Sequence, residues 1–170
     1  MWNNPILLNG LRFVLLVLAQ VLIFNRFDLM GFINPMIYVL FFYWYPIRTN
    51  RPLFLFLGFF LGFVIDLFSD TMALHAMAGL TLAYMRPVVM RFCFGANYEF
   101  QGFSFKNTTR IQRITFLLFL VLIQHIIFFT FEILSFSHIL LILKKILFTG
   151  IVTLVLSTLL SSLFAREYDK

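Results

Sequence analysis

Six apolar runs separated by short polar breaks constrain this chain more than any other feature of its sequence. A helix needs about 20 predominantly apolar residues to cross the hydrocarbon core of a bilayer. The runs therefore predict an all-α integral membrane protein, a compact bundle of about six transmembrane helices that forms a single domain over residues 1–170. The expected helices cover residues 6–24, 29–45, 53–68, 71–90, 111–134 and 139–164.

The runs at 29–45 and 53–68 are short for a membrane crossing. We expect the membrane to thin locally, or the helices to extend into flanking residues.

Composition excludes other classes of protein. Hydrophobic residues make up 62% of the sequence and charged residues 12%, which leaves no room for a soluble domain. The formal charge of +6 does not indicate nucleic-acid binding, because Lys and Arg stand at the ends of apolar runs and form no stripe. Cys93 is the single cysteine, so no intramolecular disulfide is possible.

Motifs typical of enzymes do not occur in the sequence. It contains no GxSxG nucleophile elbow, no HExxH zinc pair, no P-loop and no glycine-rich dinucleotide turn. The seven acidic residues are scattered. We therefore expect a protein that is not an enzyme and that has no catalytic residues, cofactor or metal.

The distribution of Lys and Arg predicts the orientation in the membrane, because basic residues are retained in short cytoplasmic loops. With the N-terminus inside, ten basic residues fall on the cytoplasmic side and three on the opposite side, so both termini are predicted to be cytoplasmic. The ten are Arg12, Arg48, Arg51, Arg86, Arg91, Lys106, Arg110, Arg113, Arg166 and Lys170, and the three are Arg26, Lys144 and Lys145. The two lysines leave open where the last helix starts.

Glycines and ionisable residues recur at helical spacing in the segment 58–87. Gly58, Gly62 and Asp66 are four residues apart and share one helix face, and His75 and Gly79 share a face of the next helix. We expect the glycines to let helices approach closely, as in GxxxG packing. Ionisable groups at membrane depth are costly and mark a functional site by default.

The two carboxylates of this segment have different expected roles. Asp70 is predicted to be the N-cap of the helix at 71–90, where it would accept hydrogen bonds from free backbone N–H groups. Asp66 lies about one turn earlier and is placed to accept hydrogen bonds from a neighbouring helix.

His75 is interpreted as a hydrogen-bonded structural residue. The sharper alternative is that Asp66 and His75 form a proton relay or a cation site. One carboxylate and one histidine fall short of a usual ligand set. Gln124, His125 or Glu132 would have to supply a further partner, and nothing in their spacing requires this.

The segment 91–110 is the one sizeable polar stretch, and aromatic residues alternate with its polar and basic ones. The aromatic residues are Phe92, Phe94, Tyr98, Phe100, Phe103 and Phe105. Such a loop suits the cytoplasmic head groups, and it equally suits a docking surface for another protein. We favour the membrane interpretation for this aromatic-basic loop.

Several motifs, taken in order, resemble the rod shape-determining protein MreD family, in the form found in Bacteroidetes-like bacteria. They are Asn34-Pro35 opening a run that ends FFYWYP, then Gly58, Gly62 and Asp66, then Ser69-Asp70-Thr71 leading to Leu74-His75-Ala76, and finally Tyr84-Met85-Arg86-Pro87. The order and spacing carry the resemblance over most of the chain. Ala73 departs from the pattern, since glycine is expected just before the apolar-His pair.

The resemblance implies a multi-pass protein of the bacterial inner membrane, with a fold similar to the substrate-binding subunits of energy-coupling-factor transporters. It implies a non-enzymatic role in the cell-elongation machinery that supports lateral peptidoglycan synthesis and rod shape. The implied partners are a membrane-anchored MreC-like protein, the MreB filament, a RodA-type glycosyltransferase and a penicillin-binding transpeptidase, together with membrane lipids. We expect Gly58, Gly62, Asp66, His75 and Gly79 to shape a periplasmic surface on which the MreC-like protein docks.

The alternative function is a membrane subunit that binds a vitamin or precursor for a transporter. Such a subunit needs a cavity with convergent polar groups, and the helix interiors offer few beyond Gln20, Gln124 and His125. This argues against a polar ligand and leaves a lipid open. Neighbouring genes for MreC and a penicillin-binding protein would favour the first function, and genes for transporter ATPases the second.

Overall fold

The computed structural model describes residues 5–27, 33–47, 50–95, 98, 103, 105–133 and 139–165. This part of the chain contains six α-helices, with the short 3-10 turns η1 and η3 between them. The helices are α1 (Pro5–Leu22), α2 (Val39–Trp44), α3 (Arg51–Ser69), α4 (Leu74–Phe94), α5 (Arg110–Ile133) and α6 (Ile139–Ala165), and the turns are η1 (Phe24–Arg26) and η3 (Phe105–Asn107).

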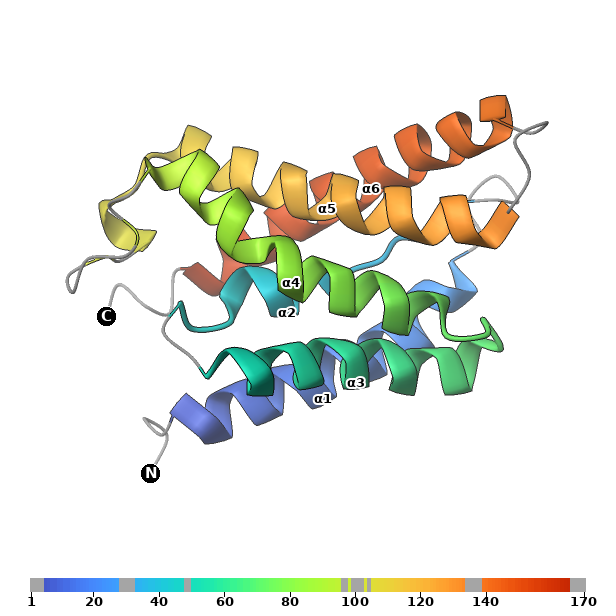
Figure 1. The fold of residues 1–170 in the computed structure, drawn as a ribbon, viewed down its shortest axis with the longest axis horizontal. Coiled ribbons are helices and arrows are strands. Elements are labelled where there is room, and N and C mark those ends of the chain that lie inside the picture. Colours follow the sequence, from blue (N-terminus) through green and yellow to red (C-terminus); the bar gives the residue numbers. More distant parts are fainter. Residues whose placement is uncertain are drawn as a thin grey trace.

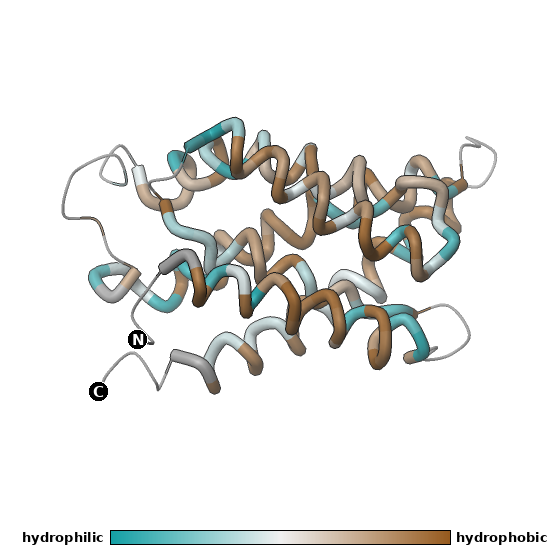
Figure 2. Tube along the Cα trace, turned by 90° about the horizontal axis from the view of Figure 1, so that it is seen from below, coloured by the Kyte–Doolittle hydropathy of each residue, from teal (hydrophilic) through white to brown (hydrophobic). Residues whose placement is uncertain are grey.

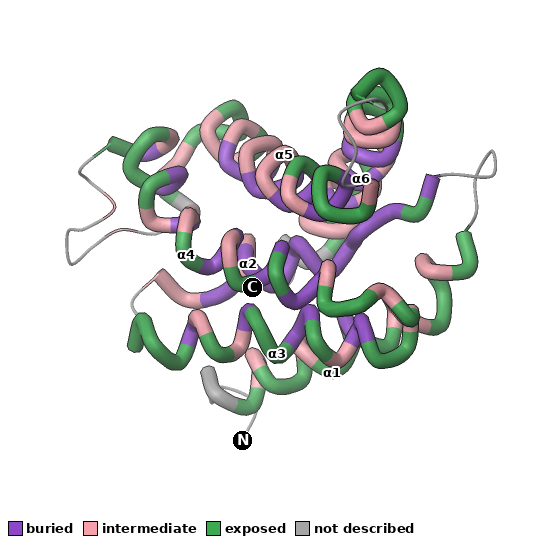
Figure 3. Tube along the Cα trace, turned by 45° about the vertical axis from the view of Figure 1, so that its right-hand side comes forward, coloured by how far each residue is buried: buried purple, intermediate pink, exposed green. Residues whose placement is uncertain are grey.

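The long helices lie side by side and form a bundle (Figure 1). α4 lies between α3 and α5, while α1 packs on α3 and α6 packs on α5. The short helix α2 lies inside, in contact with α1, α4, α5 and α6 (Figure 3). α1 begins and α6 ends at the same end of the bundle, and the turn between α3 and α4 lies at the opposite end.

Four helical stretches are long and apolar enough to cross a membrane, namely Leu7–Arg26, Arg51–Ser69, Arg110–Ile133 and Ile139–Leu163. Hydrophobic residues follow the helices along much of their length (Figure 2). On the outer helices, large apolar side chains such as Leu15, Leu18, Val155 and Leu159 are exposed. An apolar surface of this extent is stable against lipid and unfavourable in water. The chain is therefore a multi-pass membrane protein.

The predicted helix at 29–45 is wrong over much of its described length. Residues 33–36 are not helical, α2 covers only Val39–Trp44, and residues 29–32 lie outside the described part of the chain. Pro35 explains the change, because it lacks an N–H and disfavours helical backbone at Asn34. An extended residue advances about 3.3 Å and a helical one about 1.5 Å, so residues 33–44 still cover roughly 25 Å.

Side chains of two other helices complete the backbone hydrogen bonding of this non-helical segment. Gln20 of α1 accepts from the N–H of Ile37 at 2.8 Å and donates to the carbonyl of Pro35 at 3.0 Å. Thr153 of α6 accepts from the N–H of Met36 at 3.1 Å. All five residues are buried. Non-helical backbone at membrane depth is stable only when protein encloses it in this way.

Arg86 completes the hydrogen bonding just beyond the C-terminal end of α2. Its guanidinium is buried, donates to the carbonyls of Tyr45 and Pro46, and lies 5.1 Å from the ring centroid of Phe54. Those carbonyls follow the last turn of α2, so a cation stands where the helix dipole favours one. The sequence analysis counts Arg86 among the cytoplasmic basic residues. In the structure its side chain is buried inside the bundle.

The remaining helices agree with expectation more closely. The runs at 53–68, 111–134 and 139–164 appear as α3, α5 and α6 with small shifts at their ends. α6 begins at Ile139, so Lys144 and Lys145 lie within the helix and do not mark its start. Lys145 forms an ion pair with Glu132 of α5 at 2.8 Å.

The aromatic residues of the loop at 91–110 contribute to the core more than expected. Phe94 is buried and Phe105 is half-buried, and their ring centroids lie 5.4 and 6.0 Å from that of Phe116 in α5. Residues 91–94 belong to α4 and not to the loop, and Phe103 contacts the rings of both Phe94 and Phe105. Residues 96–97, 99–102 and 104, including Phe100, lie outside the described residues.

We predict that Gln20→Leu lowers the free energy of unfolding by about 2–4 kcal/mol, because it leaves two buried backbone groups without partners. Gln124→Leu is the matched control. The amide of Gln124 is also buried and lies near the Tyr38 hydroxyl, but it completes no hydrogen bond of good geometry within the described part of the chain. Its removal is expected to be neutral or stabilising. Thermal unfolding in detergent measures both variants, and equal losses would contradict the role given to Gln20.

Candidate functional site

The glycines of α3 and α4 form a close contact between the two helices. A Cβ atom at Gly58 would lie 2.9 Å from the Cβ of Ala83 and 3.0 Å from the carbonyl oxygen of Gly79. A Cβ at Gly62 would meet the backbone of His75, and one at Gly79 would meet the carbonyl of Gly58, both closer than 3.0 Å. No larger residue fits this α3–α4 seam without moving a helix. The glycines are therefore used inside the chain and do not offer a free surface.

Asp66 joins the end of α3 to the start of α4. One carboxylate oxygen accepts from the N–H of His75 at 3.0 Å and from the hydroxyl of Thr71, and the other accepts from the N–H of Ala76 at 2.8 Å. The first N–H groups of a helix have no partner within the helix, and a negative charge is favourable there. Asp66 is 6% exposed. It therefore caps α4 from the neighbouring helix.

The prediction that Asp70 is the N-cap of the helix at 71–90 is wrong. That helix begins at Leu74, and Asp70 is instead the C-cap of α3, with φ 54° and ψ 42°. Its N–H donates to the carbonyl of Asp66 at 3.0 Å. Aspartate tolerates the left-handed conformation better than most residues, which suits it to end a helix.

The turn between α3 and α4 adopts left-handed backbone at three residues, and none of them is glycine. They are Asp70 (φ 54°), Met72 (φ 46°) and Ala73 (φ 67°). Left-handed backbone costs about 1–2 kcal/mol per non-glycine residue. The capping bonds of Asp66 hold this turn. Ala73 is also the position where the resemblance to the MreD family leads one to expect glycine.

His75 contacts Tyr38 of the non-helical segment and does not use its ring to bind Asp66. Its Nδ1 is hydrogen-bonded to the Tyr38 hydroxyl at 2.9 Å, and its ring centroid lies 4.5 Å from that of Phe128. The hydrogen bonds between Asp66 and His75 involve the His75 backbone. The sequence analysis does not identify Tyr38 as the partner of His75. The feature that could have pointed to Tyr38 is its hydroxyl group, which stands within an apolar run.

Two of the further residues proposed for a relay, His125 and Glu132, are engaged elsewhere. His125 donates from Nδ1 to the carbonyl of Val121 at 2.8 Å, and its Nε2 accepts from the Thr153 hydroxyl at 3.2 Å. Glu132 pairs with Lys145. Within the described residues, no three His, Cys, Asp or Glu side chains gather as metal ligands would. The arrangement therefore fits structural hydrogen bonding better than a cation site.

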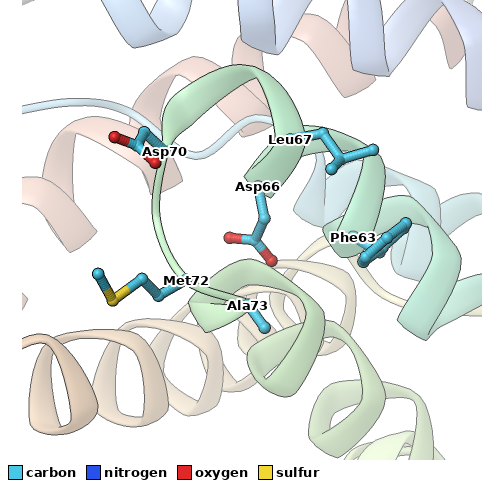
Figure 4. A pocket seen from close by; sticks show the side chains of 6 residues that line it. All are labelled: Phe63, Asp66, Leu67, Asp70, Met72 and Ala73. Atoms are coloured by element: carbon cyan, nitrogen blue, oxygen red, sulfur yellow. The ribbon is translucent and has the colours of Figure 1, made fainter.

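A surface pocket opens beside the strained turn (Figure 4). Its volume is about 250 Å³, and its lining residues are Phe63, Asp66, Leu67, Asp70, Met72 and Ala73. Leu67 is 66% and Met72 92% exposed, so apolar side chains project at its edge. We call this the turn pocket. It is the part of the predicted docking corner that remains accessible.

Comparison with known protein families, with curated proteins and with solved structures finds no match to this chain.

We predict that Gly62→Leu prevents the close contact of α3 and α4 and costs more than about 3 kcal/mol of stability, since overpacking against backbone cannot be relieved by a side-chain movement. Gly10→Leu is the matched control, because a Cβ at Gly10 meets nothing within 4 Å. Thermal unfolding in detergent measures both variants. A Gly62→Leu protein as stable as Gly10→Leu would contradict the described seam.

We predict that Ala73→Gly stabilises the protein by about 0.5–1 kcal/mol net, because relief of the left-handed backbone exceeds the entropy lost by glycine. The same change at Ala78, which is buried inside α4, should destabilise by about 1 kcal/mol or more. Opposite shifts of the unfolding temperature are the expected result. A loss of stability in both variants would argue against the strain assigned to residue 73.

Proposed function

We propose that this protein is a non-enzymatic component of the bacterial inner membrane that binds an MreC-like protein, and thereby supports lateral peptidoglycan synthesis and rod shape. The observation that carries the proposal is the turn pocket, an accessible hollow with apolar side chains at its edge, with Asp70 on the turn itself and Asp66 of α3 beneath it. A site whose shape is fixed in advance loses little conformational freedom when a partner binds.

The residues that carry the resemblance to the MreD family also hold this fold together, which supports the proposal. Pro35 begins the non-helical segment, and Arg86 caps the helix that follows it. Gly58 and Gly62 form the α3–α4 seam, and Asp66 caps α4. A shared pattern of residues with these structural roles is what a common fold would require.

We infer six crossings and a fold similar to the substrate-binding subunits of energy-coupling-factor transporters. The four candidate spans supply four crossings, and α4 is long enough for a fifth. Residues 33–44 reach roughly 25 Å, which suffices for the sixth where the membrane thins locally. The basic residues assign the end where α1 begins and α6 ends to the cytoplasm. Of these basic residues, Arg48, Arg166 and Lys170 lie outside the described part. The turn pocket then faces the periplasm.

A subunit that carries a small molecule is less favoured. The centre of the bundle is filled by the side chains of Tyr38, Phe42, Leu61, Ile65 and Phe116, each under 2% exposed. A ligand site of the usual kind encloses most of its ligand. The turn pocket, in contrast, opens on the surface.

The partner would dock with the outer end of its transmembrane helix or the segment just beyond it. Leu67 and Met72 offer exposed apolar surface, and Asp70 beside them is complementary to a basic side chain at the membrane interface. Docking at this point would hold the MreC-like protein in one assembly with the RodA-type glycosyltransferase and the penicillin-binding transpeptidase.

We predict that Leu67→Lys and Met72→Lys each lower co-purification of the MreC-like protein of the same organism by about tenfold or more, because a lysine replaces the apolar contact and neutralises Asp70. Both side chains are exposed, so the variants should insert and fold normally. Leu140→Lys is the matched control, at an exposed leucine of α6. Undiminished co-purification by inserted pocket variants, or an equal loss in the control, would contradict docking at this pocket.

A further inference from the structure

A second surface feature lies between α4 and α5, away from the turn pocket. It is a groove of about 240 Å³ lined by Met85, Val88, Val89, Phe92, Phe119 and Ile123, all of them apolar. Val89 is buried and forms its floor, while Val88 is 60% and Phe92 74% exposed. We call this the α4–α5 groove.

The dimensions of the groove suit a hydrocarbon chain. Its α4 residues extend from Met85 to Phe92, about 10 Å along the helix axis. Phe92 and Phe119 meet across it, with ring centroids 5.2 Å apart and planes at 79°. An acyl chain aligned with the helices would contact apolar side chains of both.

Basic residues stand at the end of α4 and at the start of α5, the two helices that line the groove. Arg91 precedes Phe92 and is exposed, and Arg110 and Arg113 lie in the first turn of α5. Among the described residues, Glu132 forms an ion pair with Lys145 and lies at the far end of α5. No carboxylate of the described chain is therefore paired with these three arginines.

We propose that the α4–α5 groove binds one acyl chain of an anionic phospholipid from the cytoplasmic leaflet, with the phosphate attracted by Arg91 and, at longer range, by the basic first turn of α5. Charge distinguishes this occupant from a partner's transmembrane helix. The positive-inside rule gives such a helix basic residues at its cytoplasmic end, where the arginines would repel them. An anionic head group is attracted to the same place.

The test uses the purified full-length protein and an equimolar mixture of phosphatidylglycerol and phosphatidylcholine with identical acyl chains. Native mass spectrometry counts the lipids that remain bound. We expect phosphatidylglycerol to be retained preferentially. Arg91→Gln should lower this preference about fivefold, the equivalent of the roughly 1 kcal/mol that one basic group contributes near an anionic surface. Val88→Trp should abolish retention by filling the groove.

Matched controls separate the groove from general attraction to lipid. Val155→Trp introduces the same ring on the exposed face of α6, and Arg26→Gln removes a charge in η1, away from the groove. Both should retain the preference, and unfolding temperatures verify that every variant is folded. Equal retention of the two lipids by the unchanged protein would overturn the proposal. A Val88→Trp variant that keeps its phosphatidylglycerol would also overturn it. So would a Val88→Trp variant that keeps the lipid but no longer binds the MreC-like protein, because the groove would then be a protein-binding site.

Discussion

Inside a bilayer no water completes the hydrogen bonding of a backbone N–H or C=O, so each group needs a partner within the protein. At three places in the described part of this fold, backbone groups have no backbone partner and are hydrogen-bonded by side chains instead. Gln20 and Thr153 serve the non-helical segment, Arg86 serves the end of α2, and Asp66 serves the start of α4. Each partner comes from a different helix. Apolar contact hardly distinguishes a helix from lipid, so these polar bonds determine which helices must lie together.

The α3–α4 seam and the strained turn both follow from the short distance between the backbones of α3 and α4. Asp66 reaches the N–H groups of His75 and Ala76 because glycines let the helices approach to backbone contact. At that separation the chain must reverse direction within a few residues. It does so with left-handed backbone, a cost that persists only where surrounding contacts enforce it. The shape of the turn pocket is thus set by the seam beneath it.

The sequence predicted what depends on local pattern and missed what depends on tertiary distance. Long apolar runs gave α3, α5 and α6 nearly at their observed ends, and four-residue spacing identified Gly58 and Gly62 as packing positions. Capping rules consider the residue just before a helix, so they selected Asp70, whereas the cap comes from the preceding helix.

The environments of the loop at 91–110 and of the run at 29–45 also depend on tertiary contacts, which the local sequence pattern does not show. Apolar periodicity does not separate a buried extended segment from a buried helix, so the pattern predicts a helix at residues 33–36, where the structure has none. The polar neighbours of Phe105 suggested a surface ring. Its packing depends on Phe116, which belongs to another element.

The non-helical segment also constrains the order in which the protein can be assembled. The N–H of Met36 is satisfied by Thr153, which follows it by 117 residues. When a ribosome has delivered the first two segments to the membrane, Gln20 is already present but α6 has not been made. The second segment therefore cannot reach its final hydrogen bonding as it emerges, and has to be sheltered until the C-terminal helix arrives. In this sense α6, which is synthesised after the other helices of this bundle, closes a structure that the second segment began.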